Sequence, residues 1–150
     1  MSEQENVQIV RQVCAAFEQG NIAYLLGALA EDVEWYVVGS QEHLPLAGKY
    51  HGRDRVAEIF SMVGQYLELH QFQAQEFIAQ DNQVAVFGQA RGLVKLTSRS
   101  LEYDWVHVYT LCDRQIIKFR EYLDTAAIAV AFSSPETTST GSEEPQPAYN

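Results

Sequence analysis

The chain has 150 residues, 47% of them hydrophobic and 20% charged, which is typical of one globular domain with a core of its own. No apolar run approaches the ~18 residues that a membrane span needs. Twenty acidic against ten basic residues give a formal net charge of −10, which repels phosphate backbones and anionic lipids, so we expect neither nucleic acid nor a membrane as a partner.

The N-terminal segment reads as two helices and a strand. Residues 1–5 lack the basic and apolar regions of a secretory signal, so we expect a cytoplasmic protein. Apolar residues at spacings of three and four predict a helix over 3–19. Asn21 can cap a second helix with an apolar stripe that runs to Leu29. Alternating apolar residues then predict a strand over 33–38.

The middle of the chain predicts a loop and a third helix. Residues 39–50 carry no apolar period and predict a loop long enough to act as a lid. Gly52 precedes a helix whose buried stripe runs from Val56 to Leu67.

The second half predicts four consecutive strands at about 69–79, 84–97, 101–112 and 115–123. Short polar turns separate them, which favours an antiparallel meander. Residues 126–132 predict a last helical stretch that returns to the sheet or to the mouth of a pocket. Residues 133–150 contain three prolines and many Ser and Thr, and predict a disordered tail outside a domain of residues 1–132.

One strand face carries an unusual row of side chains: Tyr103, Trp105, His107 and Tyr109. Three aromatic rings and one imidazole suit the wall of a pocket for an apolar ligand, so we place this row inward. His107 is the candidate general acid or base, since imidazole titrates around neutral pH. A structural histidine, hydrogen-bonded in the core, is the alternative.

Glu121 is the second catalytic candidate. It shares its strand face with Phe119 and other apolar residues, and we expect it to partner His107. The alternative is an ordinary ion pair at the sheet edge, for example with Arg91. Trp35 and Tyr24 are candidates for further walls of the pocket.

The sequence offers little sign of a metal or a bound cofactor. The four histidines form no pair at a spacing of four residues, and the two cysteines lack a CxxC spacing. Neither a nucleophilic GxSxG motif nor a nucleotide-binding glycine loop occurs. We therefore expect no metal and no cofactor.

The strand predicted over 84–97 carries a second apolar row: Val84, Val86, Ala90, Val94 and Leu96. Placed on the outer face of the sheet, this row would bury against a second copy of the chain. We therefore expect a homodimer through the outer sheet face.

Four short segments form a recognisable set: Gly20-Asn21-Ile22, Ala30-Glu31-Asp32-Val33, His51-Gly52-Arg53-Asp54 with Val56-Ala57, and Arg120-Glu121-Tyr122-Leu123-Asp124. Together they resemble the NTF2-like superfamily, specifically its SnoaL-like polyketide cyclase and ketosteroid isomerase group, over about residues 5–132. The resemblance implies an α+β, cystatin-like cone in which three helices pack on a bent, mostly antiparallel sheet around a pocket. Members of this group include isomerases, cyclases, epoxide hydrolases, dehydratases and binding domains.

Position by position, the resemblance argues against steroid isomerase activity. Val13 matches the position of the isomerases' tyrosine donor, Val37 matches their aspartate base, and His107 matches the protonated aspartate of their oxyanion hole. An imidazole can still donate a hydrogen bond to a ligand oxygen. The resemblance also points Trp35 and Glu121 inward.

The Asp-Arg-Asp arrangement of the epoxide hydrolases does not assemble from Arg91, Asp104 and Asp124, because strand alternation scatters them.

Two functions stay open. The first is a small enzyme, of isomerase, cyclase, hydrolase or lyase type, that performs acid–base chemistry on a small apolar oxygenated ring compound. The second is a binding or carrier domain with the same pocket. In both cases the expected walls of the pocket are Trp35, Val37, Tyr103, Trp105, Phe119, Val13 and Tyr24.

Overall fold

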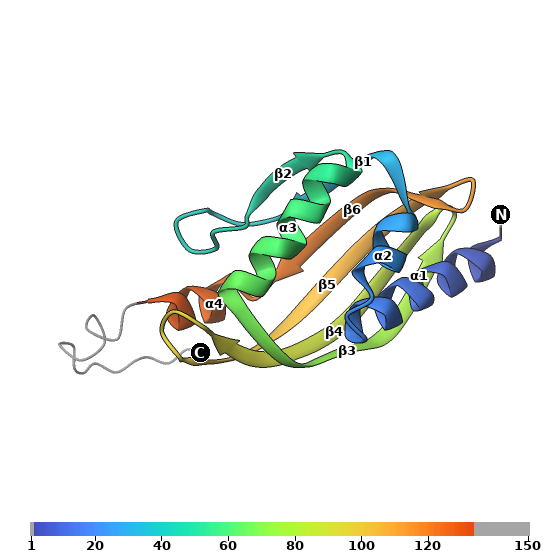
Figure 1. The fold of residues 1–150 in the computed structure, drawn as a ribbon. Coiled ribbons are helices and arrows are strands. Elements are labelled where there is room, and N and C mark those ends of the chain that lie inside the picture. The colour runs from blue at the N-terminus through green and yellow to red at the C-terminus, as the bar shows by residue number, and fades with distance from the viewer. Residues whose placement is uncertain (1, 134–150) are drawn as a thin grey trace.

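The computed structural model describes residues 2–133, which fold into one bent sheet of six strands and four helices (Figure 1). The elements are α1 (Glu3–Glu18), α2 (Ile22–Gly27), β1 (Leu29–Val37), β2 (Gly48–His51), α3 (Arg53–Tyr66), β3 (Leu67–Gln80), β4 (Gln83–Val94), β5 (Ser100–Cys112), β6 (Gln115–Leu123) and α4 (Thr125–Phe132). The predicted α+β architecture is confirmed, with α4 added to the three main helices. The tail predicted to be disordered lies outside the described residues, apart from Ser133.

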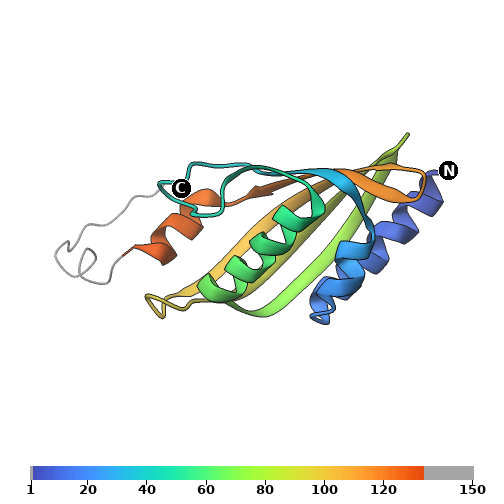
Figure 2. The ribbon, with the colours of Figure 1, turned by 45° about the horizontal axis from the view of Figure 1, so that its top comes forward.

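The strand order is β2-β1-β6-β5-β4-β3, and all neighbours are antiparallel except β1 and β6. Helices α1, α2 and α3 lie across one face of the sheet, and α4 lies at the end of β6 (Figures 1 and 2). No helix of residues 2–133 lies across the opposite face of the sheet. None of the helices in residues 2–133 is long and apolar enough to cross a membrane.

Local signals in the sequence explain where α1 begins. Ser2 and Glu5 form a capping box, in which each side chain accepts a hydrogen bond from the other residue's backbone N–H. The apolar stripe of α1 then turns Val10, Val13 and Cys14 into the core.

Two predicted elements are wrong in the first half of the chain. The second helix ends at Gly27, and Leu29 begins β1, where it pairs with Ile116 of β6. The predicted loop over 39–50 also contains β2, which pairs with β1. A four-residue edge strand that alternates between exposed and half-buried positions leaves no apolar period in the sequence.

The predicted orientation of β4 is also wrong. Val84, Val86, Ala90 and Val94 are completely buried and face the helices, while Leu96 is exposed in the connection after the strand. Because Val86 lies opposite His107, this row shares the inner face with the aromatic row of β5. It therefore belongs to the core and cannot form the surface of a homodimer.

Gly88 of β4 makes room for the largest ring of that core. A Cβ atom at this position would lie 2.2 Å from Cζ2 of Trp105 and 2.3 Å from the backbone oxygen of Gln73. The Trp105 ring therefore packs directly over the glycine and stacks on Phe72, with ring centroids 4.5 Å apart. This stack forms the floor of the inner face.

Candidate ligand cavity and the His107–Glu121 pair

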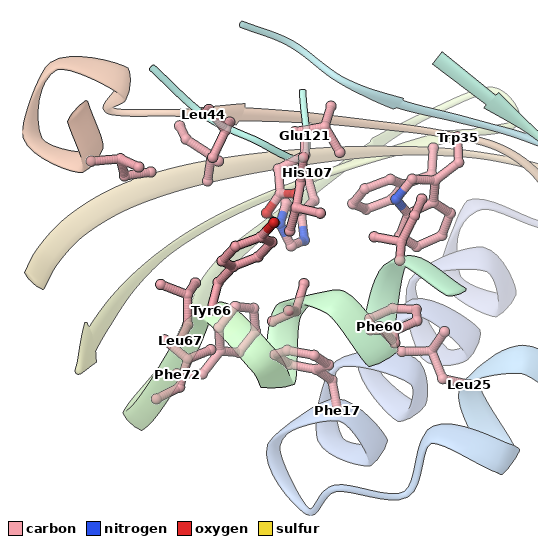
Figure 3. Close-up of a pocket in the computed structure, with 18 of the residues that line it drawn as sticks. Phe17, Leu25, Trp35, Leu44, Phe60, Tyr66, Leu67, Phe72, His107 and Glu121 are labelled. Carbon is pink, nitrogen blue, oxygen red and sulfur yellow. The ribbon is translucent and has the colours of Figure 1, made fainter. Parts of the chain in front are cut away.

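An apolar cavity of about 100 Å³ lies between the inner face of the sheet and the helices (Figure 3). Every layer of the fold contributes side chains, among them Phe17 of α1, Leu25 of α2, Trp35 of β1, Phe60 of α3, Phe72 of β3 and Leu44 of the loop before β2. Apolar cavities of this order hold small organic molecules.

His107 of β5 and Glu121 of β6 are polar side chains on the side of the cavity that the sheet forms. Nε2 of His107 lies 2.8 Å from Oε2 of Glu121, and both side chains line the cavity. A carboxylate oxygen only accepts, so Nε2–H donates, and in the neutral imidazole this leaves the lone pair on Nδ1. Nδ1 is buried and has no hydrogen-bond partner among the described residues.

Two aromatic rings fix the orientation of the imidazole. The Trp105 ring stacks against it at a centroid distance of 4.1 Å, and the Phe119 ring meets it edge-on at 4.8 Å. His107 is only 7% exposed. The side chain is therefore held by packing on two sides and by the carboxylate at Nε2.

A β-bulge creates the pairing of His107 with Glu121. The turn at Asp113 and Arg114 pairs Cys112 with Gln115, and continuing that register would place Arg120 opposite His107. The register instead shifts by one residue between Thr110 and Leu111. One extra residue on β6 thus brings Glu121 opposite His107 and turns it to the inner face.

Three of the other titratable side chains that line the cavity have raised pKa values. Burial raises the pKa of the Cys14 thiol from its ordinary value of 9.0 to about 11. Burial is also the main reason why the pKa values of Tyr103 and Tyr109 are raised, and the charge of Glu121 adds to both shifts. At neutral pH both tyrosines are therefore hydroxyl donors and Cys14 is an unreactive thiol.

These shifts predict that the protein loses stability in alkali. Above pH 9 the unfolded chain releases the Cys14 proton while the folded protein keeps it, so the stabilisation is complete below pH 9 and is lost as the pH rises toward about 11. The shift in the pKa of Cys14 corresponds to about 2–3 kcal/mol, and the buried tyrosines add to the loss above pH 10. Urea unfolding at pH 7, 9 and 10.5 measures it.

Cys14→Ala is the control for this prediction, since it removes the thiol from both states and leaves only the tyrosines. The variant should lose less stability than the parent between pH 9 and pH 10.5. Equal losses in the two proteins would contradict the contribution of the thiol.

The structure brings most of the sequence-predicted residues to the cavity. Trp35, Val37, Tyr103, Phe119 and Val13 line it together with the His107–Glu121 pair. Trp35 stacks on Phe119 at 3.8 Å, because β1 and β6 place the two residues side by side. Val37 lies next to Glu121 in the same way.

Two predicted walls need correction. Trp105 does not line the cavity, because it lies beneath Phe72 and His107 and supports them. Tyr24 is 48% exposed on α2, where its hydroxyl donates to Oε1 of Gln12 at 2.8 Å. The short α2 points this ring outward.

The structure also decides between the alternative roles that the sequence left open for Arg91, Asp104 and Asp124. Arg91 lies on the outer face and pairs with Glu102 at 3.9 Å, far from Glu121 in the fold. Asp124 caps α4 by accepting from the backbone N–H of Ala127, and the exposed Asp104 lies on β5. Arg91, Asp104 and Asp124 therefore do not form an Asp-Arg-Asp site. Within residues 2–133, no three side chains of His, Cys, Asp or Glu are grouped to hold a metal ion.

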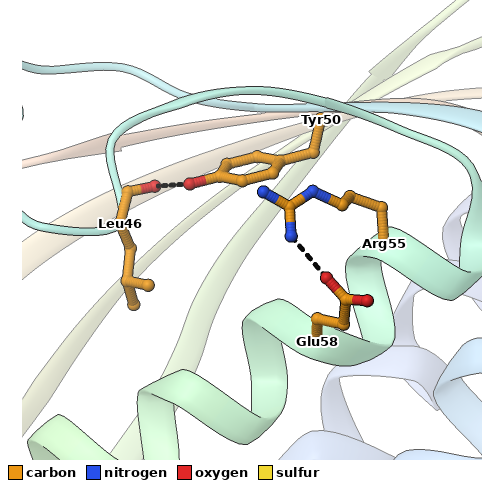
Figure 4. A network of polar contacts seen from close by, with 4 residues as sticks. All are labelled: Leu46, Tyr50, Arg55 and Glu58. Carbon is orange, nitrogen blue, oxygen red and sulfur yellow. Dashed lines mark hydrogen bonds and ion pairs between the residues drawn. The ribbon is translucent and has the colours of Figure 1, made fainter.

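The loop before β2 closes one side of the cavity, as a lid would. Leu44 and Leu46 are buried and line the cavity with Pro45. Tyr50 of β2 donates to the backbone oxygen of Leu46 at 2.9 Å, and Arg55 of α3 lies over the Tyr50 ring while pairing with Glu58 (Figure 4). The loop is thus tied to β2, which is in turn braced by α3.

Several lining residues were not predicted as ligand contacts. Phe17 and Phe60 belong to helical stripes that the sequence identifies only as core. The alternation of Leu44 and Leu46 within the predicted loop was the available signal for a buried lid. Tyr66, at the end of α3, also lines the cavity and adds a third hydroxyl (Figure 3).

Comparison with known proteins gives matches over most of the chain. A model of the SnoaL-like domain matches residues 10–119. An NTF2-like protein from Burkholderia xenovorans LB400 is 40% identical, with a TM-score of 0.78 over 89% of this chain and 99% of that chain. An NTF2-like protein of unknown function from Burkholderia pseudomallei is 28% identical, with a TM-score of 0.80 over 89% and 100%.

A more distant structure shows the same fold. TerC, co-crystallised with polyporic acid, is 24% identical, with a TM-score of 0.76 over 85% of this chain and 97% of that chain. None of the curated proteins matches the chain.

Proposed function

The chain belongs to the SnoaL-like domain family of NTF2-like proteins, and on that premise we propose that it is an enzyme that moves a proton on a small, neutral, apolar ring ketone. One observation carries the proposal: a buried imidazole in an apolar cavity has a carboxylate on one nitrogen and, among residues 2–133, no partner on the other. This is the arrangement that a general base requires.

Each residue of the proposed site has a defined role. Nδ1 of His107 removes a proton from the carbon next to the ketone, and the electron pair of that C–H bond forms the enolate. Glu121 stabilises the imidazolium that results. The Tyr103 hydroxyl, which makes no hydrogen bond with any described residue, donates to the enolate oxygen. Nδ1–H then returns the proton to the same carbon or to another one.

The charges around the cavity favour a neutral ligand. Among the described residues, Glu121 is the only acid that lines the cavity, and no Lys or Arg lines it. A ligand carboxylate would lose its hydration and face Glu121 without a cation to pair with. TerC, which has the same fold, was co-crystallised with polyporic acid, so a small-molecule ligand is in keeping with this fold.

Deuterium exchange into simple ring ketones tests this function. The protein is incubated in D₂O with 2-tetralone and cyclohex-2-enone, two ring ketones with acidic C–H bonds, and the mass of each ketone is followed. We expect faster exchange than in buffer with at least one of the two. Exchange at the buffer rate with both, at concentrations that fill the cavity, would refute the proposal.

The second candidate, a binding or carrier domain, rests on the apolar residues at two positions. By the family resemblance, Val13 and Val37 match the positions of the hydroxyl donor and the carboxylate base of ketosteroid isomerases, and both line the cavity. A carrier would bind 2-tetralone, measured by quenching of the tryptophan fluorescence to which Trp35 in the cavity wall contributes, and return it with no more deuterium than buffer alone introduces. The same incubation therefore separates the two functions.

A further inference from the structure

Two glycines with positive φ bound the part of the β1–β2 loop that closes the cavity. Gly39 has a φ of +154° and Gly48 has a φ of +141°. Residues with a side chain rarely adopt these angles, whereas glycine passes through them at little cost. Residues 40–47, which form a flap over the cavity, therefore lie between two positions that can act as hinges.

The flap makes its hydrogen bonds mostly within itself. The backbone N–H of Leu44 donates to the backbone oxygen of Ser40 at 2.9 Å, and that of Ala47 donates to the oxygen of Leu44 at 3.0 Å. The side chain of Gln41 donates to the backbone oxygen of Ala47 at 2.9 Å. The flap can therefore move as one body while these bonds stay intact.

Within residues 2–133, a single hydrogen bond joins the flap to the rest of the protein. The Tyr50 hydroxyl of β2 donates to the backbone oxygen of Leu46 at 2.9 Å, and the hinge at Gly48 lies between these two residues in the chain (Figure 4). Arg55 of α3 lies over the Tyr50 ring, so α3 helps to hold the donor in place. Opening the flap would break this bond.

The other contacts of the flap are apolar. Leu44 and Leu46 are buried and line the cavity together with Pro45. The first hinge lies against the start of α4, since a Cβ atom at Gly39 would lie 3.4 Å from Cγ2 of Thr125. Apolar contacts have no preferred direction, so they let the flap lift without a further polar group losing its partner.

We propose that the flap is the gate through which an apolar ligand enters and leaves the cavity, and that the hydrogen bond between Tyr50 and Leu46 is its latch. The flap turns about its two hinge glycines and takes its leucines out of the cavity wall. When closed, it keeps water away from the buried imidazole. The gate depends on the cavity as a ligand site, which the proposed enzyme and the carrier share, and not on the proton transfer.

Cys14 allows a test of the gate that needs no ligand. Its thiol is buried in the cavity wall, whereas Cys112 is exposed, so a reagent reaches Cys14 only when the cavity opens. Tyr50→Phe removes the latch and should speed the labelling of Cys14 by methyl methanethiosulfonate about 2–10-fold, the factor that one hydrogen bond contributes. Labelling of Cys112 should not change. Mass spectrometry of the peptides follows the two thiols separately.

Tyr24→Phe is the matched control, because it removes a hydrogen bond of 2.8 Å to Gln12 on the surface. This variant should label Cys14 at the parent rate. Below the unfolding transition, labelling through the flap should depend little on urea, whereas labelling through global unfolding rises steeply with it. Equal rates in Tyr50→Phe and the parent, an equal rise in Tyr24→Phe, or a steep dependence on urea would each overturn the gate.

Stopped-flow binding of 2-tetralone, followed by tryptophan fluorescence, separates the gate from the proposed function. In Tyr50→Phe the rates of binding and release should rise by the same factor and leave the Kd unchanged, because the latch is closed both with and without ligand. Faster release without faster binding would mean that Tyr50 holds the ligand, and would overturn the latch. If 2-tetralone does not bind at all, the proposed function fails, and the labelling of Cys14 still decides whether the gate exists.

Discussion

Replacing His107 with Gln should slow the exchange of deuterium into the ring ketone by about 10²–10⁴-fold, the usual contribution of a general base. The glutamine amide reaches Glu121 as the imidazole does and can donate to it, but it cannot take a proton from carbon. We therefore expect the midpoint of thermal unfolding to shift by only a few degrees. Mass spectrometry of the ketone and circular dichroism of the variant measure the two effects.

The chain offers a matched control for this substitution. His70 on β3 also has Nε2 within 2.7 Å of a glutamate oxygen, that of Glu68, but the pair lies on the surface. His70→Gln should leave the exchange rate unchanged. If both variants kept the parent rate, His107 would not be the base; if both lost it, the loss would have a cause other than the cavity.

Glu121→Gln separates orientation from proton transfer. The amide would let either nitrogen of His107 carry the proton, so the lone pair would no longer be fixed on Nδ1. The exchange rate should fall by less than in His107→Gln, and binding of 2-tetralone should persist. This order of effects is expected only where Glu121 acts through the imidazole.

The sequence predicted which rows of residues meet at the cavity better than it predicted their register. The alternation of Tyr103 and His107 is enough to place them on one face of their strand, because side-chain direction in a strand has a period of two, and the family resemblance placed Trp35 inward as well. The contact between His107 and Glu121 depends instead on the bulge in β6. The composition of residues 115–117 does not indicate that the strand contains an extra residue there.

The reversed orientation of β4 has a similar cause. A three-residue turn over 98–100 would place odd-numbered residues of β4 opposite odd-numbered residues of β5, leaving Val86 on the outer face. In the structure β4 ends at Val94, and Leu93 pairs with Ser100, so even-numbered residues lie opposite odd-numbered ones. A change in the length of a turn by an odd number of residues reverses every side chain of the strand.

Gly88→Ala should lower the free energy of unfolding by about 3 kcal/mol, at the upper end of the usual cost of overpacking. The added methyl group would lie within 2.3 Å of both the Trp105 ring and the backbone oxygen of Gln73. The side chain can move, but the backbone oxygen belongs to a paired strand, so part of the strain cannot relax. Urea unfolding followed by circular dichroism measures the change.

Gly64→Ala is the matched control, because a Cβ at this exposed position of α3 meets nothing within 4 Å. There the same substitution should stabilise the protein by about 0.5–1 kcal/mol, since alanine favours the helix. If the free energy of unfolding falls in Gly88→Ala and rises in Gly64→Ala, the loss is caused by the contact with the Trp105 ring above Gly88. Equal effects would mean that Trp105 has room to move, and the imidazole stacked on it would then not be held in place by the core.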